Sequence, residues 1–366
     1  MENKRIVSVD VFRGITIALM ILVNSPGTRF PYPLLDHAPW NGCTFADLVF
    51  PSFLFIVGLT IVISMNSYIT TNKFQLSRNI LKRSIILFAI GLLLNALPNH
   101  FELASFRFYG ILQRIAVCYC ICAFIYLNTS VKTQVLVFLS LLLAYCWLMT
   151  MVPVPGMGVN VLTANGSWVA YVDQMLFSSK HLLDVVYDPE GFLSTIPAIA
   201  STLLGVLTGS LLLSHFSKQE KMCVMIGLGW ILLILGWLWS FSFPINKNLW
   251  TSSYVLWSGG YALLAYALCY LIIDIWDYQK WSLPFKILGM NALFIFVLHV
   301  VLLKLQALFS YKLHNGSTGN LRHYITDLLF ANYSPQAAAL LYSIFFLGVN
   351  FLVAAFLFRR KIFIKI

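Results

Sequence analysis

The residues of this chain that could carry out chemistry are concentrated in one short stretch, LLDHAPWNGCTFADLVFP, at residues 34–51. It places two carboxylates, a histidine, an asparagine and a cysteine between two strongly apolar segments. Histidine changes its protonation state near neutral pH, so His37 could act as a base. Asn24 ends the preceding apolar segment, and its amide could donate a hydrogen bond to an oxyanion. A base together with an oxyanion donor is what acyl transfer requires.

The same stretch also has a structural explanation. Asp47 follows Thr44 by three residues, which resembles an N-terminal capping box with a carboxylate in the first helical turn. A capped loop at a membrane interface would contain similar residues. On the residues alone, catalysis and a structural loop therefore both stay open. Trp40 and Asn41 lie beside His37 and join Asp47 as candidate binding residues.

The composition is that of a membrane protein. The chain has 366 residues, of which 60% are hydrophobic and 10% charged, and its mean hydropathy is +0.82. Soluble domains carry about 25% charged residues. Many runs approach the roughly 20 apolar residues that cross a bilayer as a helix. Because we find no internal repeat and no linker, we expect residues 1–366 to form a single all-α, polytopic membrane domain.

The apolar runs predict ten membrane-spanning helices. They lie at about residues 7–25, 46–66, 83–98, 108–127, 132–152, 194–214, 222–242, 252–273, 285–305 and 336–357. An even number of spans places both termini on the same side of the membrane. The side itself follows from the basic residues, which are enriched in cytoplasmic loops.

Fifteen basic residues fall in the ends and loops on the side of the termini, and seven fall on the other side. The fifteen are Lys4, Arg5, Lys73, Arg78, Lys82, Arg83, Lys132, Lys218, Lys221, Lys280, Lys286, Arg359, Arg360, Lys361 and Lys365. The seven are Arg29, Arg107, Lys180, Lys247, Lys304, Lys312 and Arg322. We therefore expect both termini in the cytoplasm, and the loops 26–45, 153–193 and 306–335 on the outside.

The same distribution argues against two other classes of protein. A net charge of +11 could indicate nucleic-acid binding, but the basic residues are scattered among loops and form no stripe. Seven cysteines are present, and several lie inside apolar runs: Cys118, Cys120 and Cys122. Their spacing is not that of metal ligands and a disulfide framework is not expected, so we expect buried, inert thiols. We expect neither a nucleic-acid partner nor a metal.

Polar residues inside the first predicted span share one face. Asp10 and Arg13 are three residues apart, and Arg13 and Asn24 are eleven apart, which returns to within about 20° of the same direction. The distance from Arg13 to Asn24 is about 16 Å at 1.5 Å per residue. Ionisable groups in a membrane are costly, so they are functional candidates. An ion pair near the interface and a helix-packing asparagine are the alternative.

Other spans also contain polar residues. Gln113 and Arg114 lie in the fourth predicted span, Asn291 and His299 lie in the ninth, and Asn95 lies late in the third. Each could be a satisfied contact between helices. Taken together at a similar depth in the outer half of the bundle, they predict a polar cavity there. Gln113, Arg114, Asn291 and His299 are therefore further candidates for binding the substrate or cofactor.

The motif residues resemble a known family. SVDVFRGITIALMILVN…HAPWNGCTFADLVFPSFLFIVG closely resembles the transmembrane acyltransferases related to heparan-α-glucosaminide N-acetyltransferase, including their bacterial relatives. Further similar blocks follow in the family's order: FYGILQRIAV at 108–117, DPEGFLSTIPAIASTLLGVLTG at 188–209, NKNLWTSSYVLWSGG at 246–260 and ILGMNALFIFVLH at 287–299.

The resemblance implies an activity and two catalytic residues. Such enzymes take acetyl from cytoplasmic acetyl-CoA and deliver it to the amine of a terminal glucosamine on the other side of the membrane. The family's catalytic histidine in its HAxWNG block matches His37, and its helix-end asparagine matches Asn24. Trp40 could offer an apolar face to a sugar ring. The other matching motif positions, of less certain role, are Asp10, Arg13, Asn41 and Asp47.

The expected partners are acetyl-CoA, an amino-sugar acceptor, membrane lipid and a second copy of the chain. The sequence begins almost directly at its first span, without the extended lumenal portion of the animal enzyme. We therefore expect a bacterial-type member in an inner membrane, with an amino sugar or an envelope-derived or imported glycan as acceptor. A transporter, which also uses polar residues inside a bundle, and a non-catalytic acyl-CoA-binding member are the alternatives.

Overall fold

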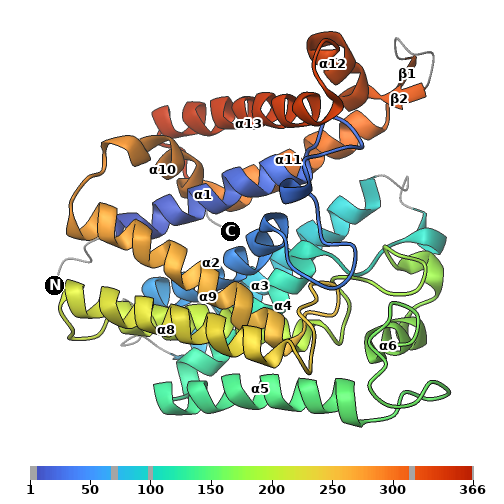
Figure 1. Cartoon of the computed structure of the whole chain (residues 1–366). Helices are drawn as coiled ribbons and strands as arrows, with labels where there is room; N and C mark the ends of the chain where they lie inside the picture. The colour runs from blue at the N-terminus through green and yellow to red at the C-terminus, as the bar shows by residue number, and fades with distance from the viewer. Residues whose placement is uncertain (1–5, 67–72, 98–101, 313–317, 365–366) are drawn as a thin grey trace. The chain divides into compact units, whose positions relative to one another are not determined.

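The structure of the chain, a computed structural model, describes residues 6–66, 73–97, 102–312 and 318–364, and it is almost entirely helical (Figure 1). The long helices are α1 (Val7–Asn24), α2 (Phe45–Asn66), α3 (Lys73–Ala96), α4 (Ile111–Asn128), α5 (Val131–Met151), α7 (Thr195–Leu212), α8 (Lys218–Trp239), α9 (Ser252–Tyr270), α11 (Ala292–Ala307) and α13 (Pro335–Arg359). The shorter ones are α6 (Trp168–Leu176), α10 (Leu283–Met290) and α12 (Leu321–Phe330). The strands β1 (Ser310–Lys312) and β2 (Thr318–Asn320) form an antiparallel hairpin.

The ten predicted spans are present, with one of them broken. Within the described ranges, nine helices are long and apolar enough to cross a membrane. The tenth candidate is a pair, Lys280–Met290 and Ala292–Ala307, bent by 70° at Asn291. Backbone groups in lipid must find partners within the protein, which explains why apolar runs of this length fold as helices. The chain is thus an all-α polytopic membrane protein.

Two boundaries differ from the prediction for physical reasons. We expected the third span to begin at residue 83, but α3 begins at Lys73 because a helix continues beyond its apolar part into a basic first segment. We expected an uninterrupted ninth span over 285–305, but the chain leaves helical geometry at Asn291. The sidedness of the termini stays a prediction, and Lys4, Arg5 and Lys365 lie outside the described residues.

The chain folds as two compact units. The larger unit consists chiefly of Pro39–Cys43 and Pro51–Leu271, and the smaller unit of Arg5–Ala38, Thr44–Phe50 and Ile272–Ile366. Both α2 and the loop before it are divided between the units. Our expectation of a single domain stays a prediction.

In the larger unit, α8 packs on α9, α3 packs on α4, and α7 packs against both α4 and α5. α2 and α7 cross with their backbones in contact. A Cβ on Gly58 would lie 1.8 Å from the carbonyl oxygen of Thr202, and a Cβ on Gly205 would lie 1.9 Å from that of Phe55. Only glycine permits this approach, which is typical of helix packing in membranes.

The smaller unit is built around α1, which packs on α10, α11 and α13. A Cβ on Gly14 would lie 1.7 Å from the carbonyl oxygen of Phe285, and one on Gly289 would lie 1.9 Å from that of Asp10. α1 and α10 are therefore fixed to each other at the first half of α1. α12 packs on α11 and α13 and lies beside the β1–β2 hairpin (Figure 1).

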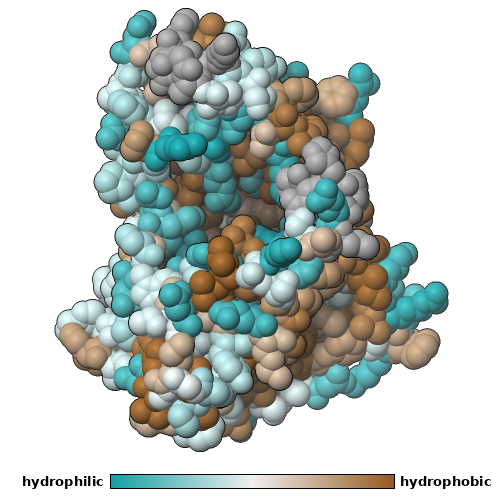
Figure 2. Space-filling model, turned by 90° about the vertical axis from the view of Figure 1, so that its right-hand side faces the viewer, coloured by the Kyte–Doolittle hydropathy of each residue, from teal (hydrophilic) through white to brown (hydrophobic). Residues whose placement is uncertain are grey.

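Large apolar side chains remain exposed on several spans. On α5, Leu136, Leu143 and Trp147 are exposed, and α8 exposes Trp230 and Ile234 among others. On the face seen in Figure 2, hydrophobic residues likewise reach the surface in patches among polar ones. Apolar surface of this extent on long helices is what lipid tails contact. The buried polar residues are therefore the informative ones.

Candidate functional site

The histidine predicted as a base is paired with a buried carboxylate. Nδ1 of His37 lies 2.8 Å from Oδ1 of Asp47, and both residues belong to the smaller unit. The carboxylate side chain is 1% exposed, whereas the imidazole is 46% exposed. An ionised carboxylate only accepts, so Nδ1 is assigned as the donor and Nε2 keeps its lone pair. This arrangement fixes the ring and makes Nε2 its basic nitrogen.

Asp47 holds the loop as well as the imidazole. Its Oδ2 accepts the backbone N–H of Ala38 at 3.1 Å and that of Thr44 at 3.0 Å. The hydroxyl of Thr44 lies 3.1 Å from the same oxygen and 2.7 Å from the carbonyl oxygen of Asp36. The bond from the Thr44 N–H to the carboxylate is the carboxylate half of the predicted capping box. The helix start that we interpreted as structural therefore also orients His37.

The segment between α1 and His37 is held against α13. The Gly27 N–H donates to the carbonyl oxygen of Ala339 at 3.2 Å, and the Thr28 hydroxyl donates to that of Pro335 at 3.0 Å. The Ser343 hydroxyl lies 2.9 Å from the carbonyl oxygen of Ser25. Polar contacts from α13 and from Asp47 thus restrain this loop on both sides of its midpoint.

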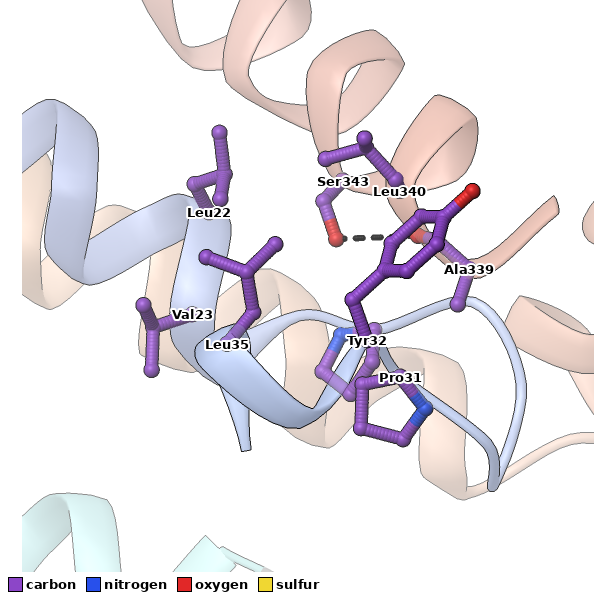
Figure 3. A pocket seen from close by; sticks show the side chains of 9 residues that line it. Leu22, Val23, Pro31, Tyr32, Leu35, Ala339, Leu340 and Ser343 are labelled. Atoms are coloured by element: carbon purple, nitrogen blue, oxygen red, sulfur yellow. Dashed lines mark hydrogen bonds between the residues drawn. The ribbon is translucent and has the colours of Figure 1, made fainter. Parts of the chain in front are cut away.

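An apolar hollow lies along this attachment. Figure 3 shows Tyr32 beside α13, close to Ala339 and Leu340, with Leu35 between it and the end of α1. The hollow measures about 210 Å³, open solvent included. Ligand pockets usually measure about 300–1,000 Å³, so this hollow is smaller than a usual ligand site. We interpret the hollow as part of the loop's anchorage.

The predicted polar face of α1 is present, but its two ends differ. Asp10 is buried, and its Oδ1 lies 3.7 Å from Nη1 of Arg13. Nη1 also donates to the carbonyl oxygen of Gly289 at 3.3 Å, so the guanidinium ties α1 to α10. Asn24 is the last residue of α1 and is exposed, and its amide makes no hydrogen bond to another described residue. Its donors remain available to a ligand.

The two polar residues of the ninth predicted span have different surroundings. Asn291 accepts from the Ile364 N–H at 2.9 Å and donates to the Ile362 carbonyl at 3.0 Å, so it clasps the segment after α13. Asn291 is two residues after Gly289, which packs against Asp10 near the start of α1. Asn291 therefore lies near the opposite end of α1 from Asn24, and our prediction that it lies in the outer half of the bundle is wrong. His299 is buried in α11, and its Nδ1 has no partner among the described residues.

Trp40 and Asn41 fold with the larger unit. The indole Nε1 of Trp40 donates to the Leu162 carbonyl at 3.0 Å, and its ring meets that of Tyr187 edge-on at 5.4 Å. Oδ1 of Asn41 accepts from Nδ2 of the buried Asn246 at 3.2 Å. These contacts bring two of the motif blocks, those around residues 39–43 and 246–250, into one part of the structure.

A buried ion-pair network lies in the same unit. Arg107 donates to both oxygens of Asp188 at 2.7 and 2.6 Å, and to Glu190 at 2.5 Å. Burial alone would lower the pKa of Arg107, but the two carboxylates raise it above its ordinary value. Asp173 on α6 accepts the backbone N–H groups of Asp188 and Phe192 at 3.0 and 3.2 Å. Burial raises the pKa of Asp173 to about 6.

The network explains why segment 188–194 is folded as it is. A Cβ on Gly191 would lie 2.2 Å from an Asp173 carboxylate oxygen, so only glycine fits above that carboxylate. Our site prediction from the sequence did not include Arg107, Asp173 or Glu190. The DPEG motif that opens the block at 188–209 was the available signal, but its basic partner lies about eighty residues away.

The polar residues of α3 and α4 have separate surroundings. Asn95 donates to the Arg107 and Tyr109 carbonyls at 3.0 and 2.6 Å, which fixes the entry to α4. Gln113 is buried against α3 beside Gly91, and its Nε2 has no described partner. Arg114 is buried toward α7, where its Nη2 donates to the Ser194 hydroxyl. Gln113 and Arg114 therefore act on different neighbours despite being adjacent.

Over the described ranges, no group of three or more His, Cys, Asp or Glu side chains is arranged to hold a metal ion. The seven cysteines are free thiols: Cys43, Cys118, Cys120, Cys122, Cys146, Cys223 and Cys269.

Comparison with known proteins identifies what this chain is similar to. The family model described as "Heparan-alpha-glucosaminide N-acetyltransferase, catalytic" matches residues 5–238. The human heparan-alpha-glucosaminide N-acetyltransferase is 30% identical over 99% of this chain, and the mouse protein is 30% identical over 81% of it. The matches span 60% of the human protein and 54% of the mouse protein.

Proposed function

Because the chain belongs to the heparan-α-glucosaminide N-acetyltransferase catalytic family, we propose that it is a transmembrane acetyltransferase. It would move acetyl from cytoplasmic acetyl-CoA to the amine of a glucosamine-type sugar on the other side of the membrane. The observation that carries this proposal is the pair formed by His37 and the buried Asp47. A histidine held by a buried carboxylate can act as a general base, and acetyl transfer to an amine, the reaction of the family, needs such a base.

His37 acts as the general base in this proposal. Its Nε2 removes a proton from the sugar amine as the nitrogen attacks the thioester carbonyl carbon. The C–N bond forms, the C–S bond breaks, and His37 returns the proton to the departing thiolate. Asp47 stabilises the imidazolium that exists between the two proton transfers, because the carboxylate is buried and already bonded to Nδ1.

Asn24 is proposed as the donor to the oxyanion. The tetrahedral intermediate carries negative charge on the former carbonyl oxygen, and one well-placed amide N–H stabilises it. The exposed position of Asn24 at the end of α1 supports this role, because its amide is not used by the fold. Asp10 and Arg13 contribute indirectly by joining α1 to α10.

The donor's phosphates are expected among the basic residues that we predict to be cytoplasmic. Lys73, Lys82 and Arg83 on α3, Lys132 on α5 and Lys218 at the start of α8 belong to the set that we predict to be cytoplasmic. An anionic nucleotide is attracted to such a surface. We favour direct transfer in a ternary complex, because a base beside a bound thioester needs no acyl-histidine step.

Release of thiol from acetyl-CoA tests the proposal. Purified protein is incubated with acetyl-CoA and glucosamine, and free CoA and N-acetylglucosamine are measured together. We expect both products in equal amounts, and a panel of further amino sugars then ranks the acceptors. Neither product with any amino sugar in the panel would favour a transporter or a non-catalytic acyl-CoA-binding protein over an enzyme. The membrane in which the reaction takes place, proposed as a bacterial inner membrane, is identified by fractionation of the source cells.

A further inference from the structure

One buried cation in the larger unit has fewer partners than a fold normally supplies. Arg114 is the fourth residue of α4 and is 2% exposed. Its Nη2 donates to the Ser194 hydroxyl and lies 3.4 Å from the Gly191 carbonyl oxygen. Its Nε and Nη1 have no partner among the described residues. One N–H bond on Nε and two on Nη1 are therefore left without an acceptor.

The neighbouring carboxylates are already engaged elsewhere. Both oxygens of Asp188 and one of Glu190 bind Arg107, and Asp173 binds two backbone N–H groups. No salt bridge joins Arg114 to a carboxylate in the described part of the chain, and the side chain that accepts a hydrogen bond from it there is the neutral Ser194. Buried charges in proteins are normally paired or fully hydrogen-bonded, and this one is neither.

The aromatic ring above the guanidinium restricts where a partner can bind. The Trp250 ring lies 4.9 Å from the guanidinium carbon and covers one face by a cation–π contact. Trp250 is fully buried, and its Nε1 donates to the Ser201 hydroxyl at 3.1 Å. Its φ of 53° lies in the left-handed region, which a bulky residue rarely adopts. An additional partner must therefore approach in the plane of the guanidinium.

The local charges indicate what kind of partner fits. Two arginines, 107 and 114, face three carboxylates, of which Asp173 has a pKa raised by burial. The carboxylates at least balance the two guanidinium charges, so the cluster does not need a multiply charged anion. In-plane N–H groups of a buried guanidinium bind carbonyl and carboxylate oxygens well.

We propose that Nε and Nη1 of Arg114 bind a carbonyl or carboxylate oxygen of a substrate. The proposal rests on the acetyltransferase function proposed above. Two sources supply this chemistry: the acetyl-CoA donor, through the carbonyl oxygens of its pantetheine arm, and a sugar acceptor that carries a carboxylate or an amide. Arg114 is then a substrate-binding residue that family likeness alone does not assign.

The test compares substrate affinities in an Arg114→Gln variant. Michaelis constants are measured separately for acetyl-CoA and for an amino-sugar acceptor, and each substrate's stabilising effect on thermal unfolding is measured without turnover. We expect KM for one of the two to rise about 10- to 100-fold, the usual range for a lost hydrogen bond to a charged group. The same substrate should lose its stabilising effect. The substrate that is affected identifies the source of the oxygen.

A matched control separates binding from structure. Ser194→Ala keeps the guanidinium and removes its described side-chain partner, so both KM values should stay within about threefold of the parent's. If Arg114→Gln does not fold, Arg114→Lys, which keeps the charge with differently placed donors, supplies the same comparison. A folded Arg114 variant with both KM values and both stabilising effects unchanged overturns the proposal. Absence of acetyl transfer in the parent would instead contradict the proposed function, while the thermal measurements still report on Arg114.

Discussion

His37 and Asp47 are joined by a 2.8 Å contact between Nδ1 and Oδ1, across ten residues of sequence. The carboxylate is buried at the start of α2, so the helix that anchors it also sets the direction of the imidazole. Each element on which the proposed chemistry depends can therefore be tested separately.

Asp47→Asn is expected to lower the rate of acetyl transfer by about 10³. An asparagine amide can donate to Nδ1, which stabilises the imidazole tautomer with the wrong nitrogen protonated, and comparable pairs lose about 10⁴ in this way. The rate is measured with saturating substrates. An Asp47→Asn rate within tenfold of the parent's would contradict the role of Asp47 in orienting and charging His37.

Thr44→Ala is the matched control for that variant. It removes the hydroxyl that contacts both Asp36 and Asp47, but it keeps the contact between Asp47 and His37. A lost helix cap costs about 0.5–2 kcal/mol of stability. We therefore expect Thr44→Ala to lower the unfolding temperature while its turnover stays within about threefold of the parent's. A large loss of turnover here would mean that loop rigidity, and not the dyad, limits the rate.

Asn24→Ala is expected to slow acetyl transfer by about 10²–10³, the usual effect of losing one oxyanion donor. Asn24→Asp should be slower still, because it places negative charge where negative charge develops. Asn24 is exposed at the end of α1, so both variants should fold and unfold like the parent. Parent-like turnover of Asn24→Asp would remove Asn24 from the mechanism.

The raised pKa of Asp173 predicts that the stability of the fold decreases as the pH rises. Its pKa is about 6 in the folded chain and 3.8 as an ordinary value, so between these values the folded state holds more protons than the unfolded state. This pKa difference contributes roughly 3 kcal/mol to the free energy of unfolding. The contribution is fully present below about pH 4 and is lost as the pH rises through about 6. Thermal unfolding of the parent and of Asp173→Asn between pH 4 and 7 measures it. The parent's advantage should shrink with rising pH, and a constant or growing advantage would contradict the assignment.

Cysteine labelling tests the predicted sidedness. In a variant without native cysteines, Phe30→Cys should react with an impermeant maleimide added outside intact cells, because Phe30 is 65% exposed in a loop predicted to face outward. Lys73→Cys, at the start of α3, should react only after the membrane is opened. Asn72, the residue before it, lies outside the described residues. The reverse pattern would place His37 on the side of CoA and exclude transfer across the membrane.

The sequence predicted the spans well because length and hydropathy determine which segments cross a bilayer. It did not predict the break at Asn291. The side chain of Asn291 hydrogen-bonds the backbone of Ile362 and Ile364, and no spacing rule relates these positions. The start of α3 was placed too late because its first helical segment is polar.

The candidate site was predicted in part. His37 and Asn24 were named from their residue types and from family likeness, and their roles stay predictions. Asp47 was named with a weaker role, because its interaction with His37 depends on the path of a loop that sequence does not specify. The network of Arg107, Asp173 and Glu190 was missed because its members come from the segment before α4, from α6 and from the segment before α7, and only folding brings them together.

The most direct test of the whole account is the turnover of a His37→Ala variant in the acetyl-CoA and glucosamine assay. His37 lies in an exposed loop, so the variant should fold and should bind acetyl-CoA like the parent. His215→Ala, which removes an exposed histidine in the segment between α7 and α8, is the control and should keep full activity. We predict that His37→Ala loses acetyl transfer by at least about 10², the lower range for removal of a general base. A folded His37→Ala protein that transfers acetyl at nearly the parent's rate would contradict the assignment of His37 as the base.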